Sequence, residues 1–192
     1  MKAAALTAGR LDMATAMRLA EKAGFARMAA LDTSKLVFHP AVREMCAADR
    51  CHQYGKNWVC PPGCGSLAEC AARASGYGSG LLVQTAAKMR DDFDAPAMLA
   101  AEAQHQQRFA AFVAAARLVE ANCLPLGAGA CKLCADCTYP NAPCRHPDSA
   151  ISSMEAFGLL VADICHDCGL PYSDGRRSLV FSSCLLFGGA MQ

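Results

Sequence analysis

Four cysteines lie close together in the segment CKLCADCTYPNAPC, which covers residues 131–144. Cys131, Cys134 and Cys137 are three positions apart, and Cys144 follows within reach of them. Iron–sulfur clusters are held by cysteine thiolates at short spacings of this kind. The segment therefore predicts a metal site, and a [4Fe-4S] cluster is the first hypothesis for it. Four cysteines binding Zn²⁺ are the alternative.

A second group of cysteines lies in the segment 46–70, at irregular spacings that are typical of loop ligands gathered around a cluster. Five candidates compete there for four places: Cys46, Cys51, Cys60, Cys64 and Cys70. Cys51 and Cys60 rank highest, and Cys46 follows them. The backbone after Cys60 is restricted because Pro61 and Pro62 follow it. Zn²⁺ is a stronger alternative at this looser site than at the first.

The choice between Cys64 and Cys70 depends on a predicted helix. Ser66 and Glu69 form a capping box, which predicts a helix that ends at Gly76. Cys70 then lies in the first turns, where free N–H groups and the helix dipole favour a thiolate over a thiol. We therefore rank Cys70 slightly above Cys64.

Composition limits the class of protein. The chain holds 13 cysteines, an odd number that cannot all pair, and its 18 Lys and Arg residues balance 17 Asp and Glu residues. This balance does not indicate a nucleic-acid or acidic-membrane partner. The apolar run at the N-terminus stops at Arg10, short of the about 7 to 15 residues of a signal peptide. We therefore expect a cytoplasmic protein that does not span a membrane, with thiols that bind metal instead of forming disulfides.

Hydrophobic periodicity predicts one α/β domain over residues 1–192, with α+β possible: a small central sheet flanked by helices, with cysteine-rich loops that hold two metal clusters. Helices are expected at 12–23, 66–76 and 94–121, with a short helix that ends at Gly158. Strands are expected at 81–84, 124–126 and 178–187. Two further strands, joined by a polar turn, are expected before Pro40, and the second of them ends there. His105 is expected to be a core or solvated side chain, and Cys184 a small hydrophobe.

Other residues near the cysteines leave alternatives open. Tyr54 and Trp58 either shield a cluster from water or pack their loop, and Lys56 either donates a hydrogen bond to cluster sulfur or binds an anion. Cys165 and Cys168 have a redox-motif or half-zinc spacing but follow or end a helix, so free thiols are the preferred interpretation.

Several segments together resemble a known family. These segments are MC, CHQYGKNWVCPP, LLVQT, GACKLCADCTYPNAPCRHPD and SSMEAFGL, between about Leu31 and Phe187. They are similar to the predicted metal-binding proteins of DUF2284, a family found largely in anaerobic bacteria and archaea. The resemblance implies iron–sulfur or other metal binding, with Cys46, Cys51, Cys60 and Cys70, then Cys131, Cys134, Cys137 and Cys144, as ligands. Cys64, Cys165, Cys168 and Cys184 depart from the family pattern.

The leading functional hypothesis is an iron–sulfur protein with two [4Fe-4S] clusters that exchanges low-potential electrons with a redox partner protein in anaerobic metabolism. The first alternative is an enzyme in which a cluster held by three cysteines binds substrate at its fourth iron. The second is a structural adaptor with zinc sites. The sequence assigns no catalytic residue and no oligomeric state.

Overall fold

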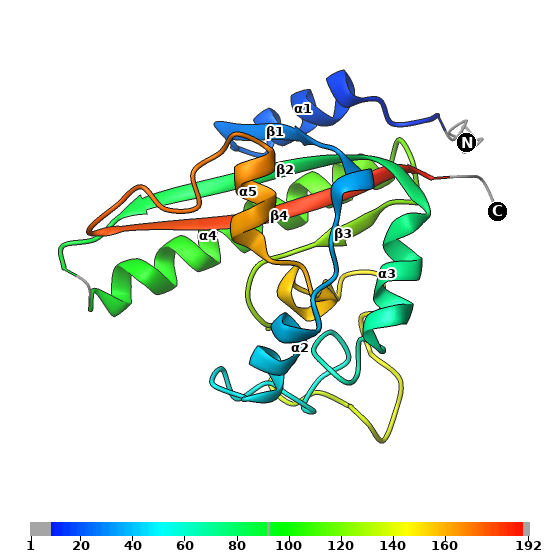
Figure 1. Cartoon of the computed structure of the whole chain (residues 1–192), viewed down its shortest axis with the longest axis vertical. Helices are drawn as coiled ribbons and strands as arrows, with labels where there is room; N and C mark the ends of the chain where they lie inside the picture. The colour runs from blue at the N-terminus through cyan, green and yellow to red at the C-terminus, as the bar shows by residue number, and fades with distance from the viewer. Residues whose placement is uncertain (1–8, 92, 190–192) are drawn as a thin grey trace, which may run out of the picture.

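The computed structural model describes residues 9–91 and 93–189, which form an α+β fold around a four-stranded antiparallel sheet (Figure 1). The strand order is β1-β2-β4-β3. The strands are β1 (Arg27–Leu31), β2 (Tyr77–Lys88), β3 (Leu124–Leu126) and β4 (Ser178–Gly189). The long strands β2 and β4 pair from Tyr77 opposite Gly189 to Lys88 opposite Ser178. This pair forms the centre of the molecule.

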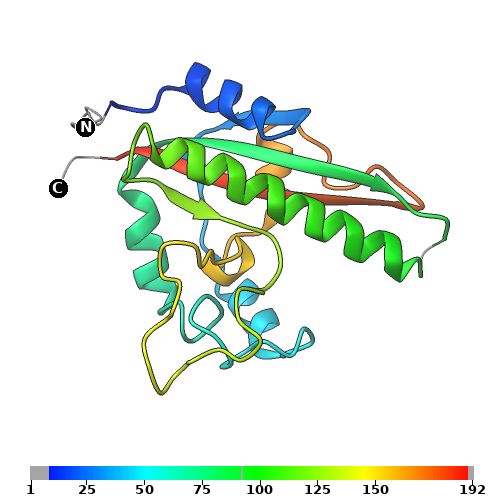
Figure 2. The same cartoon turned by 180° about the vertical axis from the view of Figure 1, so that it is seen from behind.

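Helices α1 (Met13–Lys22) and α4 (Ala95–Arg117) cover one face of the sheet, as Figure 2 shows. Both begin at an aspartate whose carboxylate accepts a backbone N–H: Asp12 from Thr15 and Asp94 from Ala97. The predicted apolar stripe of α4 faces the sheet, because Phe109, Phe112, Val113 and Ala116 are all buried. The interpretation of α4 as a helix that covers a sheet is confirmed.

The opposite face packs against α3 (Leu67–Ser75), η2 (Glu155–Phe157) and α5 (Val161–Asp167). Alternate residues of a strand point to opposite faces. Thus Leu82, Cys184 and Leu186 join this second core, while Leu81 and Leu185 join the core under α4. The expectation that Cys184 packs as a small hydrophobe is confirmed, because its side chain is fully buried there.

Local signals located several elements correctly. The capping box of Ser66 and Glu69 is present, and α3 ends at Gly76. Gly158 ends η2 with a φ of 82°, and a Cβ there would collide with Leu67. The predicted helix at 94–121 is shorter than expected, because α4 ends at Arg117.

The expected second strand before Pro40 is wrong. Phe38 makes one isolated bridge with Leu159, and Pro40 opens helix α2 (Pro40–Ala47). Proline suits the first turn of a helix, since the N–H that it lacks has no intrahelical partner there. A 3₁₀ turn, η1 (Thr33–Lys35), occupies the polar segment before it.

Two loops that are distant in sequence lie side by side beyond the sheet in both views (Figures 1 and 2). We call α2 with these loops, residues 40–66 and 127–150, the cysteine lobe. Trp58 joins the two loops: its Nε1 donates to the carbonyl oxygen of Ala142 at 3.1 Å, and its ring meets that of Tyr139 edge-on at 4.9 Å. In the part of the chain that the structure describes, no helix is long and apolar enough to cross a membrane.

Candidate metal centre

The first site is a cavity of about 220 Å³ lined by Cys46, Cys51 and Cys60. Cys46 lies in the last turn of α2, while Cys51 and Cys60 lie in the loop that follows. Tyr54 and Glu155 also line this cavity. Burial raises the pKa of Cys46 and of Cys60, and the charge of Glu155 adds to the rise at Cys46. These three thiols therefore face a shared and partly desolvated space.

The buried Asn57 fixes the loop that presents Cys60. Its Oδ1 accepts the backbone N–H of Val59 at 3.1 Å and of Cys60 at 2.9 Å, and its Nδ2 donates to Gln53. A short polar side chain that binds the backbone two or three residues on is the usual way to stabilise such a turn. Gly63 is needed beside it, because a Cβ there would collide with the carbonyl oxygen of Asn57.

The second site brings together the four cysteines of the CKLCADCTYPNAPC run. Cys131, Cys134, Cys137 and Cys144 line a narrower cavity of about 30 Å³, with Trp58 on its wall. Burial raises the pKa of Cys131, and the other three cysteines raise it further. The backbone N–H of His146 donates to the sulfur of Cys144 at 3.4 Å.

The two cavities are neighbours. The charge of Cys131 contributes to the raised pKa of Cys60, which places the two groups within electrostatic range of each other. Gly129 and Ala130, just before Cys131, line the first cavity, while Asn57 and Val59 line the second. Each cysteine segment thus forms part of the wall of the other site.

Neither Cys64 nor Cys70 lines either cavity, and the two lie next to each other. The interaction between their thiols lowers the pKa of Cys70 and raises that of Cys64. Nη1 of Arg43 lies 3.5 Å from the sulfur of Cys64 and 3.7 Å from that of Cys70, and Nη2 of Arg73 lies 3.4 Å from Cys70. Of the five cysteines in the segment 46–70, the structure therefore gathers three in one cavity and places two beneath arginines.

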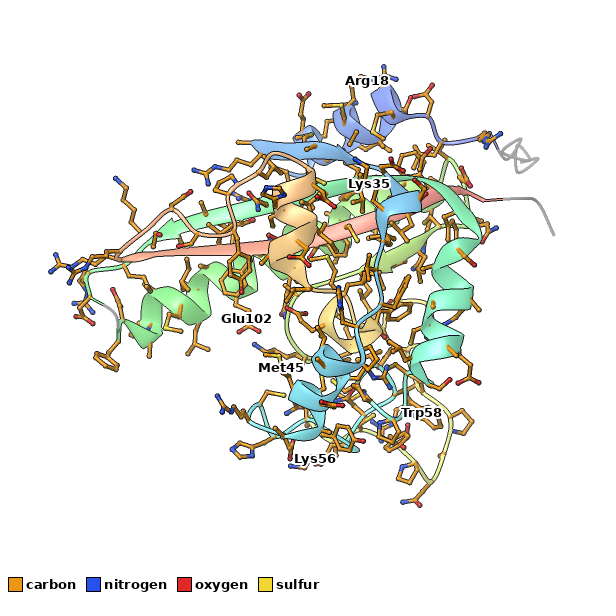
Figure 3. The ribbon with its side chains drawn as sticks, in the orientation of Figure 1. Arg18, Lys35, Met45, Lys56, Trp58 and Glu102 are labelled. Atoms are coloured by element: carbon orange, nitrogen blue, oxygen red, sulfur yellow. The ribbon has the colours of Figure 1, made fainter. Side chains whose placement is uncertain are left out.

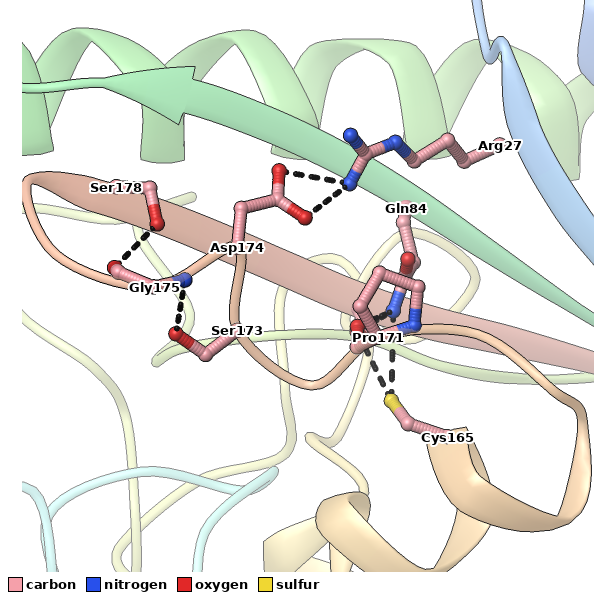
Figure 4. Close-up of polar contacts among 9 residues, drawn as sticks. Arg27, Gln84, Cys165, Pro171, Ser173, Asp174, Gly175 and Ser178 are labelled. Carbon is pink, nitrogen blue, oxygen red and sulfur yellow. Dashed lines mark hydrogen bonds and ion pairs between the residues drawn. The ribbon is translucent and has the colours of Figure 1, made fainter.

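The remaining cysteines are distributed through the cores. Cys165 is buried and accepts a hydrogen bond from Nε2 of Gln84, which also donates to the carbonyl oxygen of Pro171 (Figure 4). Cys168 caps the C-terminal end of α5, and burial raises its pKa to about 11. Cys123 is buried near the end of α4. All thirteen cysteines are free thiols.

The thiol donors suit a metal centre at both sites, and the space differs between the sites. No three Cys, His, Asp or Glu side chains among the described residues converge as one metal ion requires. Thiolates around zinc lie about 2.3 Å from the metal, whereas a cubane spreads its ligands over four irons. The first cavity of about 220 Å³ is several times the ~30 Å³ that one water occupies. A cluster at the narrower second site requires the loop over residues 131–144 to open.

The sequence of residues 29–187 matches the family described as "Predicted metal-binding protein (DUF2284)". The chain belongs to this family. The match covers both cysteine groups and the sheet except for the first two residues of β1 and the last two of β4, so metal binding and the family resemblance are supported together. No curated protein and no solved structure matches the chain.

The structure also adds residues that sequence reasoning did not single out. Arg43 contacts both sulfurs of the Cys64 and Cys70 pair, and Glu155 lines the first cavity. Figure 3 shows Trp58 within the lobe and Lys56 at its outer edge, where Lys56 is exposed. An arginine at the position of Arg43 carries no distinctive local signal, whereas Asn57, directly before the WVC of Cys60, is a turn signal that was available.

Proposed function

We propose that this chain is an iron–sulfur protein that binds two [4Fe-4S] clusters and passes low-potential electrons to a redox partner protein. The clusters would be held by the three thiols of the first cavity, with Cys70 as the fourth ligand that the family resemblance implies, and by the four thiols of the second. When bound, each cluster supplies a one-electron carrier. The proposal places the protein in a reducing compartment such as the cytoplasm, where thiols stay available as ligands.

One observation carries this proposal: two groups of thiols, from segments more than sixty positions apart, line adjoining cavities. Structural metal sites that order separate loops have no need to adjoin, whereas electron carriers that exchange electrons do. Gly129 and Ala130, directly before Cys131, line the first cavity, so the two proposed centres would lie close enough to exchange electrons.

The residues of the lobe would tune and shield such centres. The N–H of His146 that points to the sulfur of Cys144 stabilises a thiolate and raises the reduction potential of a cluster held there. Tyr54 and Trp58 each line one cavity with an aromatic ring and would help to shield a cluster there from water. Cys51 and Cys137 are exposed, as are Met45 and Leu133, so a partner protein can approach both centres.

The second candidate is an enzyme whose first cluster is held by three cysteines and binds substrate at the fourth iron. It is favoured by the position of Cys70, whose sulfur lies beside two arginines and does not line the first cavity. Tyr54 and Glu155 would then face the substrate. An open coordination position is what distinguishes catalytic from structural metal sites.

Anaerobic reconstitution followed by iron and acid-labile sulfide analysis tests the proposal. We expect about eight irons and eight sulfides per chain, and the loss of about half of each in Cys134→Ser. Cys168→Ser is the matched control and should retain both, since Cys168 caps the end of α5 and lines neither cavity. A preparation that holds zinc and no sulfide would contradict the proposal.

Cys70→Ser separates the two candidates. Electron transfer with four protein ligands predicts that this variant loses the first cluster. The open-iron enzyme predicts that it keeps both clusters, and that small ligands change the electron paramagnetic resonance spectrum of the reduced wild-type protein. A spectrum that no ligand alters would exclude the second candidate.

A further inference from the structure

A buried polar network crosses the core under α4, outside the cysteine sites. His105 is 1% exposed, and its imidazole lies between two hydroxyls: Nδ1 is 3.0 Å from Oγ1 of Thr85, and Nε2 is 2.7 Å from Oγ of Ser183. Phe25 and Phe109 pack against the ring. The network joins α4 to both central strands of the sheet.

His105 and Ser183 form the inner end of a cavity of about 280 Å³. Phe109 and Ile151 contribute its apolar walls. The backbone of residues 127–130 forms another side and leads directly into Cys131, which also lines the second cysteine cavity. An engineered apolar cavity of about 150 Å³ holds benzene, so this one has room for a six-membered ring with a substituent.

The rim of the cavity carries charges that are already paired. Nζ of Lys132 lies 2.8 Å from Oε2 of Glu102, and Figure 3 shows Glu102 on the α4 side of the lobe. Gln106 donates to the carbonyl oxygen of Ala128. The described lining therefore holds no unpaired cation that could bind an anionic ligand.

The hydroxyl of Ser183 keeps one hydrogen-bonding function free after it has paired with His105. A neutral imidazole has one N–H, so it and the two hydroxyls supply three hydrogens for two hydrogen bonds. If Ser183 donates to Nε2, its oxygen lone pairs remain free to accept. If Nε2–H donates to Ser183, the serine hydroxyl hydrogen remains free to donate. In either tautomer Ser183 keeps one hydrogen-bonding function free. Its side chain is 0% exposed, so a ligand that pairs with it must displace the surrounding lining slightly.

From this geometry we infer that the cavity is a binding site for a small, uncharged ring molecule that carries one hydroxyl or carbonyl oxygen. The ring occupies the space between Phe109 and Ile151, and the oxygen pairs with Ser183. A carboxylate is disfavoured, because a neutral imidazole and a hydroxyl do not compensate a buried charge. Cys131, Lys132 and Leu133 line this cavity, so the inference concerns the chain without a cluster at the second cysteine site.

The test uses fluorine NMR titrations of the full chain with four para-substituted fluorobenzenes of similar size. These are 4-fluorobenzyl alcohol, 4-fluoroacetophenone, 4-fluorotoluene and 4-fluorobenzoate. We expect saturable binding of the alcohol and the ketone. The toluene should bind about five-fold more weakly, the worth of one hydrogen bond, and the benzoate should not bind.

Two variants locate the site. Ala110→Phe, on an exposed position of α4 that lines the cavity, fills its mouth and should abolish binding; Ala111→Phe is the same change at an exposed position outside the lining and should leave binding unchanged. Ser183→Ala should remove the preference for the alcohol over the toluene. Absence of saturable binding by any probe, equal binding to Ala110→Phe, or tightest binding of the benzoate would overturn the inference.

Discussion

The burial of His105 makes the stability of the fold depend on pH in a defined window. Burial lowers the pKa of this imidazole to about 4, with a smaller contribution from the nearby charge of Arg108. Its other neighbours are the hydroxyls of Thr85 and Ser183 and the rings of phenylalanines, none of which carries a charge at neutral pH. The folded protein therefore holds His105 neutral at physiological pH.

The magnitude follows from proton linkage. The unfolded histidine titrates near 6.5, the folded one near 4, so between these values the unfolded state binds more protons. The free energy of unfolding therefore rises with pH across this window. The stabilisation that comes from keeping His105 neutral is fully present above pH ~6.5 and is lost on acidification towards pH ~4. At about 1.4 kcal/mol for each pKa unit, the full effect is about 3 kcal/mol. Between about pH 7.5 and about pH 5.5, roughly 1.3 kcal/mol is lost.

Urea unfolding of the wild type and of His105→Gln at these two pH values measures the effect. The glutamine keeps a donor and an acceptor near both hydroxyls but does not titrate, so groups elsewhere contribute equally to both proteins. We expect the free energy of unfolding to fall by about 1.3 kcal/mol more in the wild type than in the variant. Equal falls in the two proteins would refute the burial of a neutral imidazole at this position.

Three further predictions concern the core, a buried carboxylate and the single tryptophan. Phe112→Ala should lower the free energy of unfolding by about 3–5 kcal/mol, because Phe112 is fully buried. The same change at Phe93, which is 90% exposed, should cost less than about 0.5 kcal/mol. Equal losses in the two variants would contradict the core assignment. Glu120→Ala should cost about 2–4 kcal/mol in denaturant unfolding, since it leaves two backbone amides, one before α1 and one in β4, without an acceptor. Glu120→Gln retains an acceptor oxygen and should cost less. Equal losses in the two variants would argue against this role. Trp58 is the only tryptophan and lines the second cysteine cavity, so removal of a cluster by chelation should raise its fluorescence. N-acetyltryptophanamide in the same solution is the control. Fluorescence that does not change would argue against a cluster beside Trp58.

Local sequence signals located those elements that local energetics decide. Side-chain caps at Asp12, Ser66 and Asp94 satisfy free N–H groups within three residues, so the starts of α1, α3 and α4 are readable from neighbouring residues. Pro40 shows the limit of such signals, since proline both ends a strand and begins a helix. Packing of α2 on η2, which is remote in sequence, selects the helix.

The sequence by itself determined that the chain carries two groups of cysteines, and the spacing of Cys131, Cys134 and Cys137 defined the tighter group. Only the tertiary structure separated Cys46, Cys51 and Cys60 from Cys64 and Cys70. The five have no fixed period, because the path of a loop depends on contacts such as that of Arg43 with the carbonyl oxygen of Ala156, 113 positions away.

The same reason applies to His105. Helical periodicity placed it on α4, but its partners Thr85 and Ser183 come from strands 20 and 78 positions away. Side-chain spacing fixes which face of an element a residue occupies. The register of β2 against β4, set by the packing of both sheet faces, decides what that face meets.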